Sequence, residues 1–194
     1  MSARIVDQHS ARQLPWKNGA GVTLELAIAP DGASLHDFDW RISSALVASD
    51  GAFSHFPGID RSLGLLDGAG LRLILPDHTL QLDAHNPLTS FPGELAIRAE
   101  LLDGAVTDLN LMSRRGHWRH RMQHQLLAGK LQIDSAAVLL IYCQSGAALE
   151  CSWPGAPALS FGSGQGLLLE DEPGPLTLSN QGNSSLFIAW LERV

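Results

Sequence analysis

Trp16, Lys17 and Asn18 place an indole, an ammonium group and an amide side by side, directly before the flexible stretch GAG, residues 19–21. An ammonium group binds anions and an amide both donates and accepts hydrogen bonds, so this stretch can dock a polar guest. The residues after this stretch alternate as in a strand. A phosphate-binding loop is instead followed by a helix, whose N-terminus binds the phosphate. The stretch is therefore a candidate docking segment but no phosphate loop.

The stretch DGAFSHFPGIDR, residues 50–61, joins an apolar turn to two charged residues. The turn consists of Phe53, Phe56 and Pro57. Gly58 allows the chain to swing so that Asp60 and Arg61 face back toward whatever the turn covers. An arginine binds a carboxylate with two parallel hydrogen bonds, which fixes both charge and orientation. Two interpretations stay open: Arg61 binds an anionic guest, or a salt bridge to Asp60 or Glu25 fastens the loop.

The stretch DLNLMSRR, residues 108–115, has two distinct faces if it forms a strand. Asp108, Asn110 and Met112 lie on one face, opposite Leu109, Leu111 and Ser113. The polar face either lines a cavity or is an ordinary hydrated surface, and the hydrated surface is the commoner case. An earlier stretch, residues 40–47, alternates in the same way and carries Arg41 and Ser43 on one face.

Metal and nucleophilic chemistry find little support in the sequence. An HxH pair followed by a glutamate on a strand can bind a metal with side chains on one strand face. The eight histidines of this sequence include no such arrangement. His117, His120 and His124 have the spacing of one side of a helix, but exposed histidines explain this pattern better than a metal site. There is no GxSxG motif, and Cys143 and Cys151 are expected to be buried free thiols. No cofactor is expected.

Composition and charge narrow the class of protein. Apolar residues make up 45% and charged residues 17% of the 194 residues, as in a soluble domain with a substantial core. The net charge of −7 argues against direct nucleic-acid binding, which needs a basic face. The longest apolar run, residues 136–143, is far below the roughly 20 residues that span a bilayer, and no secretory signal is visible, so a cytoplasmic protein is expected.

Short alternating strands dominate the chain and must position these residues. A hairpin is expected where residues 63–66 and 71–75 flank the turn DGAG, residues 67–70. Further strands are expected at residues 22–29, 40–47, 79–83, 94–102, 106–112, 138–143, 148–153, 166–170, 176–179 and 186–191. Residues 118–127 alone have a pattern compatible with a helix. The fold class is therefore all-β, a sandwich or a barrel.

The two halves of the chain resemble each other weakly, because each contains a Gly-x-Gly turn, at residues 68–70 and at residues 164–166. A diverged duplication would give two β-rolls. The expected organisation is an N-terminal roll over residues 1–115, a connection over 116–130 and a C-terminal roll over 131–194, packed as one unit.

Taken together, these stretches resemble the HutD/Ves family. The resemblance rests on PWKNG at residues 15–19 with Gly21, Thr23 and Glu25, on WRxS at 40–43, on DGxFSxFPGxDR at 50–61, on LxGxGL at 66–71 and on DxNLM at 108–112, followed by Arg114 or Arg115. These motifs cover residues 14–115, and the strand rhythm alone matches beyond them. Ala20 stands where the family has the middle of three consecutive glycines.

The resemblance implies a bicupin-like fold of two stacked β-rolls, in agreement with the strand pattern. It implies a role in histidine utilisation, where HutD proteins restrain or tune the pathway and catalyse no step, while the Ves branch is associated with cold and stress response. It also implies a small acidic guest of the formylglutamate or formiminoglutamate type, bound near the barrel mouth. A homodimer is compatible with an open sheet edge.

A pocket hypothesis follows from this resemblance. It places Trp16, Lys17 and Asn18 in one wall, Glu25, Arg41 and Ser43 on the floor and Arg61 at the rim. Arg61 would bind one carboxylate of the guest and Lys17 would act as a point charge, while Ser43 and Asn18 hydrogen-bond a formyl or formimino group. Glu25 would hold Lys17 or Arg41 in place, because like charges repel. Supporting positions are Gly19, Gly21, Phe56, Pro57, Gly58, Asp60, Asp108 and Asn110.

Other functions stay open. A metal-independent isomerase, hydrolase or lyase acting on the same acid would use Glu25 or Asp60 as a general base. A cupin metal dioxygenase ranks last, because no facial set of histidines is recognisable. The basic run at residues 114–121 is interpreted as a solvated connection, with contact to an anion or a protein partner as the alternative.

Overall fold

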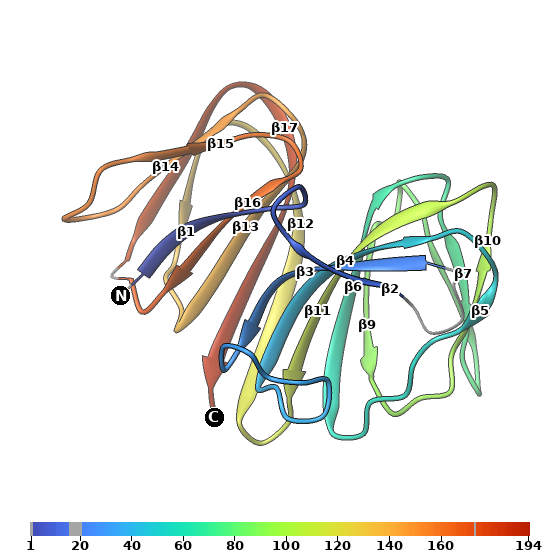
Figure 1. Ribbon diagram of the computed structural model, residues 1–194. Coiled ribbons are helices and arrows are strands. Elements are labelled where there is room, and N and C mark those ends of the chain that lie inside the picture. The colour runs from blue at the N-terminus through green and yellow to red at the C-terminus, as the bar shows by residue number, and fades with distance from the viewer. Residues whose placement is uncertain (1, 16–20, 173) are drawn as a thin grey trace. The chain divides into compact units, whose positions relative to one another are not determined.

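The computed structural model describes residues 2–15, 21–172 and 174–194 of the chain. Every regular element in these residues is a β-strand, and seventeen strands are present (Figure 1). The all-β prediction is therefore confirmed. The described residues contain no helix that is long and apolar enough to cross a membrane. The chain divides into two compact units: unit 1 comprises Met1–Ser10 and His120–Val194, and unit 2 comprises Ala11–Arg119.

Unit 2 consists of two antiparallel sheets that share one core. Its six-stranded sheet has the order β2 (Arg12–Pro15), β3 (Gly21–Ala29), β4 (Trp40–Val47), β11 (Val106–Arg114), β6 (Ile59–Asp67) and β9 (Leu88–Pro92). Its four-stranded sheet has the order β5 (Gly51–Ala52), β10 (Arg98–Leu101), β7 (Leu71–Ile74) and β8 (Thr79–Leu82). Leu63 and Leu65 of β6 belong to the same buried cluster as Leu71 and Leu73 of β7. The two sheets therefore face each other within unit 2.

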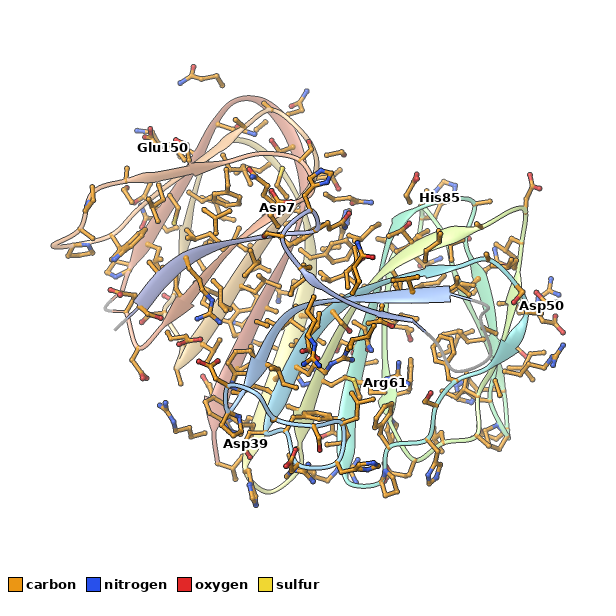
Figure 2. The ribbon with its side chains drawn as sticks, in the orientation of Figure 1. Asp7, Asp39, Asp50, Arg61, His85 and Glu150 are labelled. Carbon is orange, nitrogen blue, oxygen red and sulfur yellow. The ribbon has the colours of Figure 1, made fainter. Side chains whose placement is uncertain are left out.

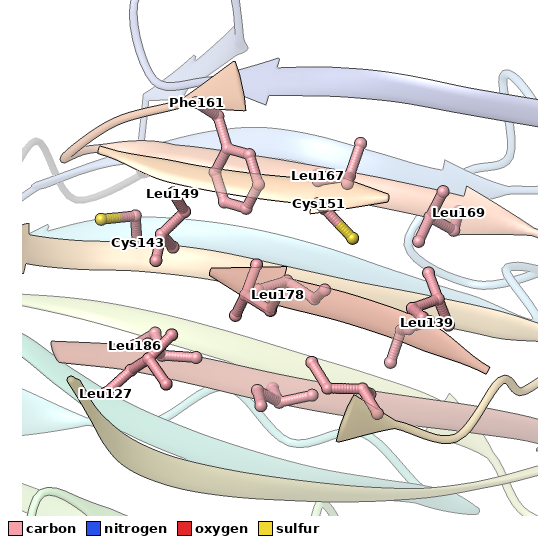
Figure 3. Close-up of a cluster of buried hydrophobic side chains, with 14 of the residues drawn as sticks. Leu127, Leu139, Cys143, Leu149, Cys151, Phe161, Leu167, Leu169, Leu178 and Leu186 are labelled. Atoms are coloured by element: carbon pink, nitrogen blue, oxygen red, sulfur yellow. The ribbon is translucent and has the colours of Figure 1, made fainter. Parts of the chain in front are cut away.

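Unit 1 is built on a seven-stranded sheet with an apolar core. The order is β1 (Ser2–Asp7), β16 (Gln165–Glu170), β13 (Val138–Gly146), β17 (Leu176–Arg193), β14 (Leu149–Ser152) and β15 (Leu159–Phe161), and β12 (Trp118–Ile133) also pairs with β17. Cys143 and Cys151 are free and lie among the leucines of this core (Figure 3). Burial raises the pKa of the Cys151 thiol to about 12. The expectation of buried free thiols is therefore confirmed.

Alternation in the sequence predicted most strands of the sheets. β4 has the expected bounds, and β3 begins one residue before the expected 22–29. β17 unites two expected strands, residues 176–179 and 186–191, because the residues between them continue to pair with β14 and then with β13. The polar sequence NQGNSS, residues 180–185, therefore lies where β17 changes its partner strand. The chain does not reverse its direction there.

The expected hairpin at residues 63–66 and 71–75 is wrong. β6 pairs with β11 and β9, whereas β7 pairs with β10 and β8, so residues 67–70 carry the chain from one sheet of unit 2 to the other. Gly70 has a φ of 124°, and a Cβ atom at this position would overlap the carbonyl oxygen of Leu82. Two glycines in a turn look the same in a sequence whether the flanking strands pair or part.

A helix over residues 118–127 is also wrong, because these residues begin β12. Trp118 and Met122 are buried four residues apart, and a strand places such a pair on one face just as a helix does. β12 thus runs through the expected connection at residues 116–130. β1 pairs along its length with β16, which brings the first ten residues into the unit of the second half. The diverged duplication stays a prediction.

We expect Gly70→Ala to destabilise the protein by at least about 3 kcal/mol, because the new Cβ meets backbone atoms and the positive φ adds strain. Gly104→Ala is the matched control: its φ is 67°, and no atom of the described residues other than those of Gly104 and its two chain neighbours lies within 4 Å of the added Cβ. Strain alone should cost about 1 kcal/mol at that position. Urea unfolding measures both losses, and equal losses would contradict the close approach at Gly70.

Candidate functional site

Polar side chains gather on the inner face of the six-stranded sheet of unit 2. Residues directly opposite one another on paired strands share a face. One row across β3, β4, β11 and β6 consists of Glu25, Ser43, Asn110 and Leu63, the next contains Arg41, Met112 and Arg61, and a third contains Ala45, Asp108 and Leu65. Leu63 and Leu65 belong to the buried core of unit 2. The polar cluster, defined as Glu25, Arg41, Ser43, Arg61, Asp108 and Asn110, therefore lies against that core.

Arg41 has its charge balanced within the polar cluster. Its Nε donates to Oε2 of Glu25 at 2.8 Å, and its Nη1 donates to the hydroxyl of Ser43 at 3.4 Å. The side chains of Arg41 and Glu25 are only 6% and 8% exposed, so water screens this ion pair weakly. The prediction that Glu25 holds Arg41 in place is therefore confirmed.

Arg61 has no carboxylate partner among the described residues. Its Nε donates to Oδ1 of Asn110 at 3.4 Å and its Nη1 donates to the backbone carbonyl of Ser54 at 3.5 Å. The interpretation in which Arg61 forms a salt bridge to Asp60 or Glu25 is wrong, because Asp60 pairs with Arg115 and Glu25 pairs with Arg41. The prediction that Arg61 lies at a rim is also wrong, since the residue is only 7% exposed.

Three phenyl rings cover the Arg61 guanidinium. Its Cζ lies 5.1 Å from the ring centre of Phe53, 5.8 Å from that of Phe56 and 5.2 Å from that of Phe91. Figure 2 shows Arg61 among the side chains of unit 2. Aromatic faces attract a cation but replace little of the hydration that it loses. Burial, helped by the charge of Arg41 and opposed by that of Asp108, lowers the pKa of Arg61 to about 10, so the group stays charged at neutral pH.

Asp108 is the second buried charged group without a full set of partners. The residue is 4% exposed, and its Oδ1 has no hydrogen-bond partner among the described residues. Burial raises the pKa of Asp108 to about 7, although the positive charge of Arg61 and the backbone N–H of Ala45 oppose this rise. The commoner interpretation of this strand face, a hydrated surface, is therefore wrong for Asp108.

The basic run at residues 114–121 makes structural contacts that its charge did not predict. Arg114 donates to the carbonyl of Phe38 at 2.9 Å. Arg115 lies 2.6 Å from Asp60 and 2.8 Å from Glu94 in an exposed ion-pair group. Asp60 therefore serves an ion pair at the surface of unit 2, which gives no support to the alternative in which it acts as a general base.

The described residues contain no group of three or more histidine, cysteine, aspartate or glutamate side chains that could hold a metal ion. The expected helical alignment of three histidines is lost, because β12 is a strand. His117 Nδ1 lies 3.3 Å from Oδ1 of Asp39, whereas His124 Nε2 lies 2.7 Å from the hydroxyl of Ser185. These two rings therefore serve separate contacts.

Several predicted site residues lie outside the described part of the chain. These are Trp16, Lys17, Asn18 and Gly19, so the place of the first three in a pocket wall stays a prediction. Gly21 begins β3, and Gly58 has the positive φ, 73°, that its expected role in a turn requires. Asp108 is among the expected supporting positions, but its burial was not predicted, because the alternation of the stretch DLNLM does not tell which face is covered.

Comparisons with known protein sequences give a consistent result. A family model described as HutD matches residues 8–188. Protein Ves of Cronobacter sakazakii is 40% identical over 136 residues, which cover 68% of this chain and 71% of that protein. An uncharacterised 21.2 kDa protein of Pseudomonas putida, named for its place in the region 3′ of hutC, is 33% identical over 178 residues, which cover 90% of each chain.

Solved structures agree with this match. A conserved protein of unknown function from Pseudomonas aeruginosa PAO1 has a TM-score of 0.91 at 31% identity, over 99% of this chain and 100% of that chain. HutD from Pseudomonas fluorescens SBW25, determined in a formate condition, has a TM-score of 0.82 at 22% identity, over 100% of both chains. A cupin 2 conserved barrel domain protein from Leptotrichia buccalis has a TM-score of 0.60 at 11% identity, over 93% and 96%. The expected cupin-like fold is therefore confirmed.

The raised pKa of Asp108 predicts how stability depends on pH. The folded value of about 7 lies above the ordinary value of 3.8, so the folded state binds more protons than the unfolded state between these values. Stability should therefore fall as pH rises from about 4 to about 7. Asp108→Asn removes this pH-dependent contribution to stability. The free energy of unfolding of the variant, relative to that of wild type, should therefore be roughly 3 kcal/mol higher at about pH 8 than at about pH 5.

Urea unfolding at the two pH values measures this effect. The matched control is Asp103→Asn, which removes an exposed carboxylate between β10 and β11. The control should show no comparable change with pH. If the stability difference between Asp108→Asn and wild type is the same at both pH values, the account of a buried, proton-binding Asp108 is wrong.

Proposed function

The chain belongs to the HutD family, and we propose that it is a non-enzymatic regulator of histidine utilisation that senses a small acid of the formylglutamate type at Arg61. Family membership gives the broader role, one related to histidine utilisation. The guest and the act of sensing are the proposal, and the polar cluster supports them.

The buried guanidinium of Arg61 is the observation that carries this proposal. A charge removed from water needs compensating partners, yet both of its hydrogen bonds go to neutral oxygens, at 3.4 and 3.5 Å. A carboxylate complements this group, because its two oxygens match two N–H groups on one edge of a guanidinium. We therefore assign the acid group of the guest to Arg61.

The charges of the polar cluster favour one carboxylate at this position. Arg41 already has Glu25 as its partner at 2.8 Å. Arg61 is thus the one cation of the polar cluster that lacks a carboxylate, within the residues that the structure describes. A formylglutamate-like guest carries a second carboxylate, and we assign it to Lys17 on the sequence argument alone.

Neutral donors of the polar cluster suit the remaining end of the guest. Asn110 accepts a hydrogen bond from Arg61 with Oδ1, and Ser43 accepts one from Arg41 with its hydroxyl oxygen. An asparagine that accepts in this way still has two N–H donors, and a serine still has one O–H donor. These groups fit the oxygen or nitrogen of a formyl or formimino group.

An enzyme acting on the same acid is a second candidate, and Asp108 is the observation that favours it. A general base works best with a pKa near the working pH, and the pKa of Asp108 lies at about 7. Glu25 and Asp60, the bases expected from the sequence, are both engaged in ion pairs. We rank the regulator first, because the guanidinium of Arg61, whose two hydrogen bonds go to neutral oxygens, supports the binding of an acid and requires no reaction.

Isothermal titration with N-formylglutamate, N-formiminoglutamate, urocanate, glutamate and formate tests the proposal. We expect saturable binding of one acid, and we expect Arg61→Ala to weaken it at least tenfold, because about 2 kcal/mol of charge-assisted hydrogen bonding is lost. Arg61→Lys keeps the positive charge but loses the pair of parallel N–H donors. Its affinity for the acid should therefore lie between those of wild type and Arg61→Ala.

Arg115→Ala is the control, since it removes an arginine of unit 2 that lies in an exposed ion-pair group and away from the polar cluster. It should bind like wild type. Product analysis after prolonged incubation separates the two functions: binding without product supports the regulator, and turnover supports the enzyme. If none of the five acids binds to the folded protein, the proposal of a sensor is refuted.

A further inference from the structure

The protonation state of Asp108 determines the net charge of the polar cluster. Among the residues that the structure describes, the charged groups that face this region are Arg61 from β6, Arg41 from β4 and Glu25 from β3. Arg12 from β2 reaches Glu25 at 3.9 Å, but its side chain is 68% exposed. The opposite sheet contributes apolar side chains, which include Leu71, Leu73, Leu82 and Ala99. Two guanidinium groups and two carboxyl groups therefore lie on one face of the six-stranded sheet.

These groups balance to zero when Asp108 is ionised, because two positive charges meet two negative charges. Such a site gains little from a further anion, since one carboxylate of the guest would bring the charge of the polar cluster to −1. The balance changes when Asp108 carries a proton. The cluster then has a charge of +1, and one carboxylate neutralises it.

The position of Asp108 makes this protonation state sensitive to what occupies Arg61. Asp108 forms no salt bridge with Arg61 in the described residues, and its Oδ1 has no hydrogen-bond partner. The charge of Arg61 is nevertheless close enough to oppose the rise of the Asp108 pKa. A carboxylate on Arg61 would cancel that favourable field and add a negative charge of its own.

We propose that Asp108 sets the charge selectivity of the site, because this buried carboxyl takes up a proton when an anion binds to Arg61. This inference rests on the proposed function, since it concerns the same site and the same guest. The site then accepts an anion together with a proton, and its affinity depends on pH as well as on the guest. Asp108 acts through the charge balance and needs no contact with the guest.

Linkage fixes the direction of the pH dependence. Below about pH 6 the carboxyl group is neutral in the empty and in the occupied site, so affinity stays constant. Above about pH 7 the empty site loses the proton that the occupied site retains, so affinity falls by up to about tenfold per pH unit. A rise in pH therefore releases the guest, and acidification retains it.

Calorimetry with N-formylglutamate at about pH 6 and pH 8 tests the inference. Titrations in Tris and in HEPES, two buffers with different heats of ionisation, report the number of protons taken up. We expect uptake near zero at pH 6 and approaching one at pH 8, with about tenfold weaker binding at pH 8. Asp108→Asn should show no uptake and the same affinity at both pH values, whereas Asp103→Asn should behave like wild type. Equal proton uptake by Asp108→Asn and wild type would overturn the inference.

A second readout separates this inference from the proposed guest. Carbon-13 NMR of labelled aspartate carboxyl groups, assigned with Asp108→Asn, gives the titration midpoint of Asp108 with and without an excess of formate. The inference predicts that formate raises the midpoint. If N-formylglutamate does not bind but formate still raises the midpoint, the guest is wrong and the proton coupling stands. A midpoint that formate leaves unchanged refutes the coupling, whatever the guest.

Discussion

The proposed site in unit 2 depends on the burial of a guanidinium group that has no carboxylate partner among the described residues. Arg61 is 7% exposed, and its partners are two neutral oxygens and three phenyl rings. Burial of a cation with partial compensation costs free energy, which a protein core seldom retains without use. Comparison within the same sheet makes the point clearer, because Arg41 has the carboxylate that Arg61 lacks. One guanidinium is fixed by an ion pair, and we propose that the other binds an anion.

Strand register is what brings these groups together. Their positions in the sequence range from residue 25 to residue 110, and four neighbouring strands place them in adjacent rows on one face. The same face continues as the apolar core of unit 2, so the polar cluster is held on rigid elements and away from water. This setting strengthens each electrostatic interaction, and it also makes the protonation of Asp108 depend on its neighbours.

The sequence allowed prediction of the strands that alternate clearly, such as β4, and of the pair between Glu25 and Arg41. It did not allow prediction of which sheet a strand joins, so the glycines at residues 67–70 predicted a hairpin where the chain in fact changes sheets. It named Asp108 as a supporting residue but did not predict its burial, because a strand that alternates polar and apolar residues looks the same whether its polar face meets water or a core. These errors share a cause: local spacing fixes the faces of a strand, while long-range pairing decides what each face meets.

The central claim, that Arg61 is the buried cation reserved for an acid, is tested most directly by nitrogen-15 NMR of the arginine side chains during titration with N-formylglutamate. The Nε signals of Arg61 and Arg41, assigned by substitution of each, report the two guanidinium groups in one experiment. The account predicts a saturable shift of the Arg61 signal and a much smaller change for Arg41, which keeps its bond to Glu25. A saturable shift of Arg41 with Arg61 unchanged, or no shift of either signal at saturating acid, would contradict it.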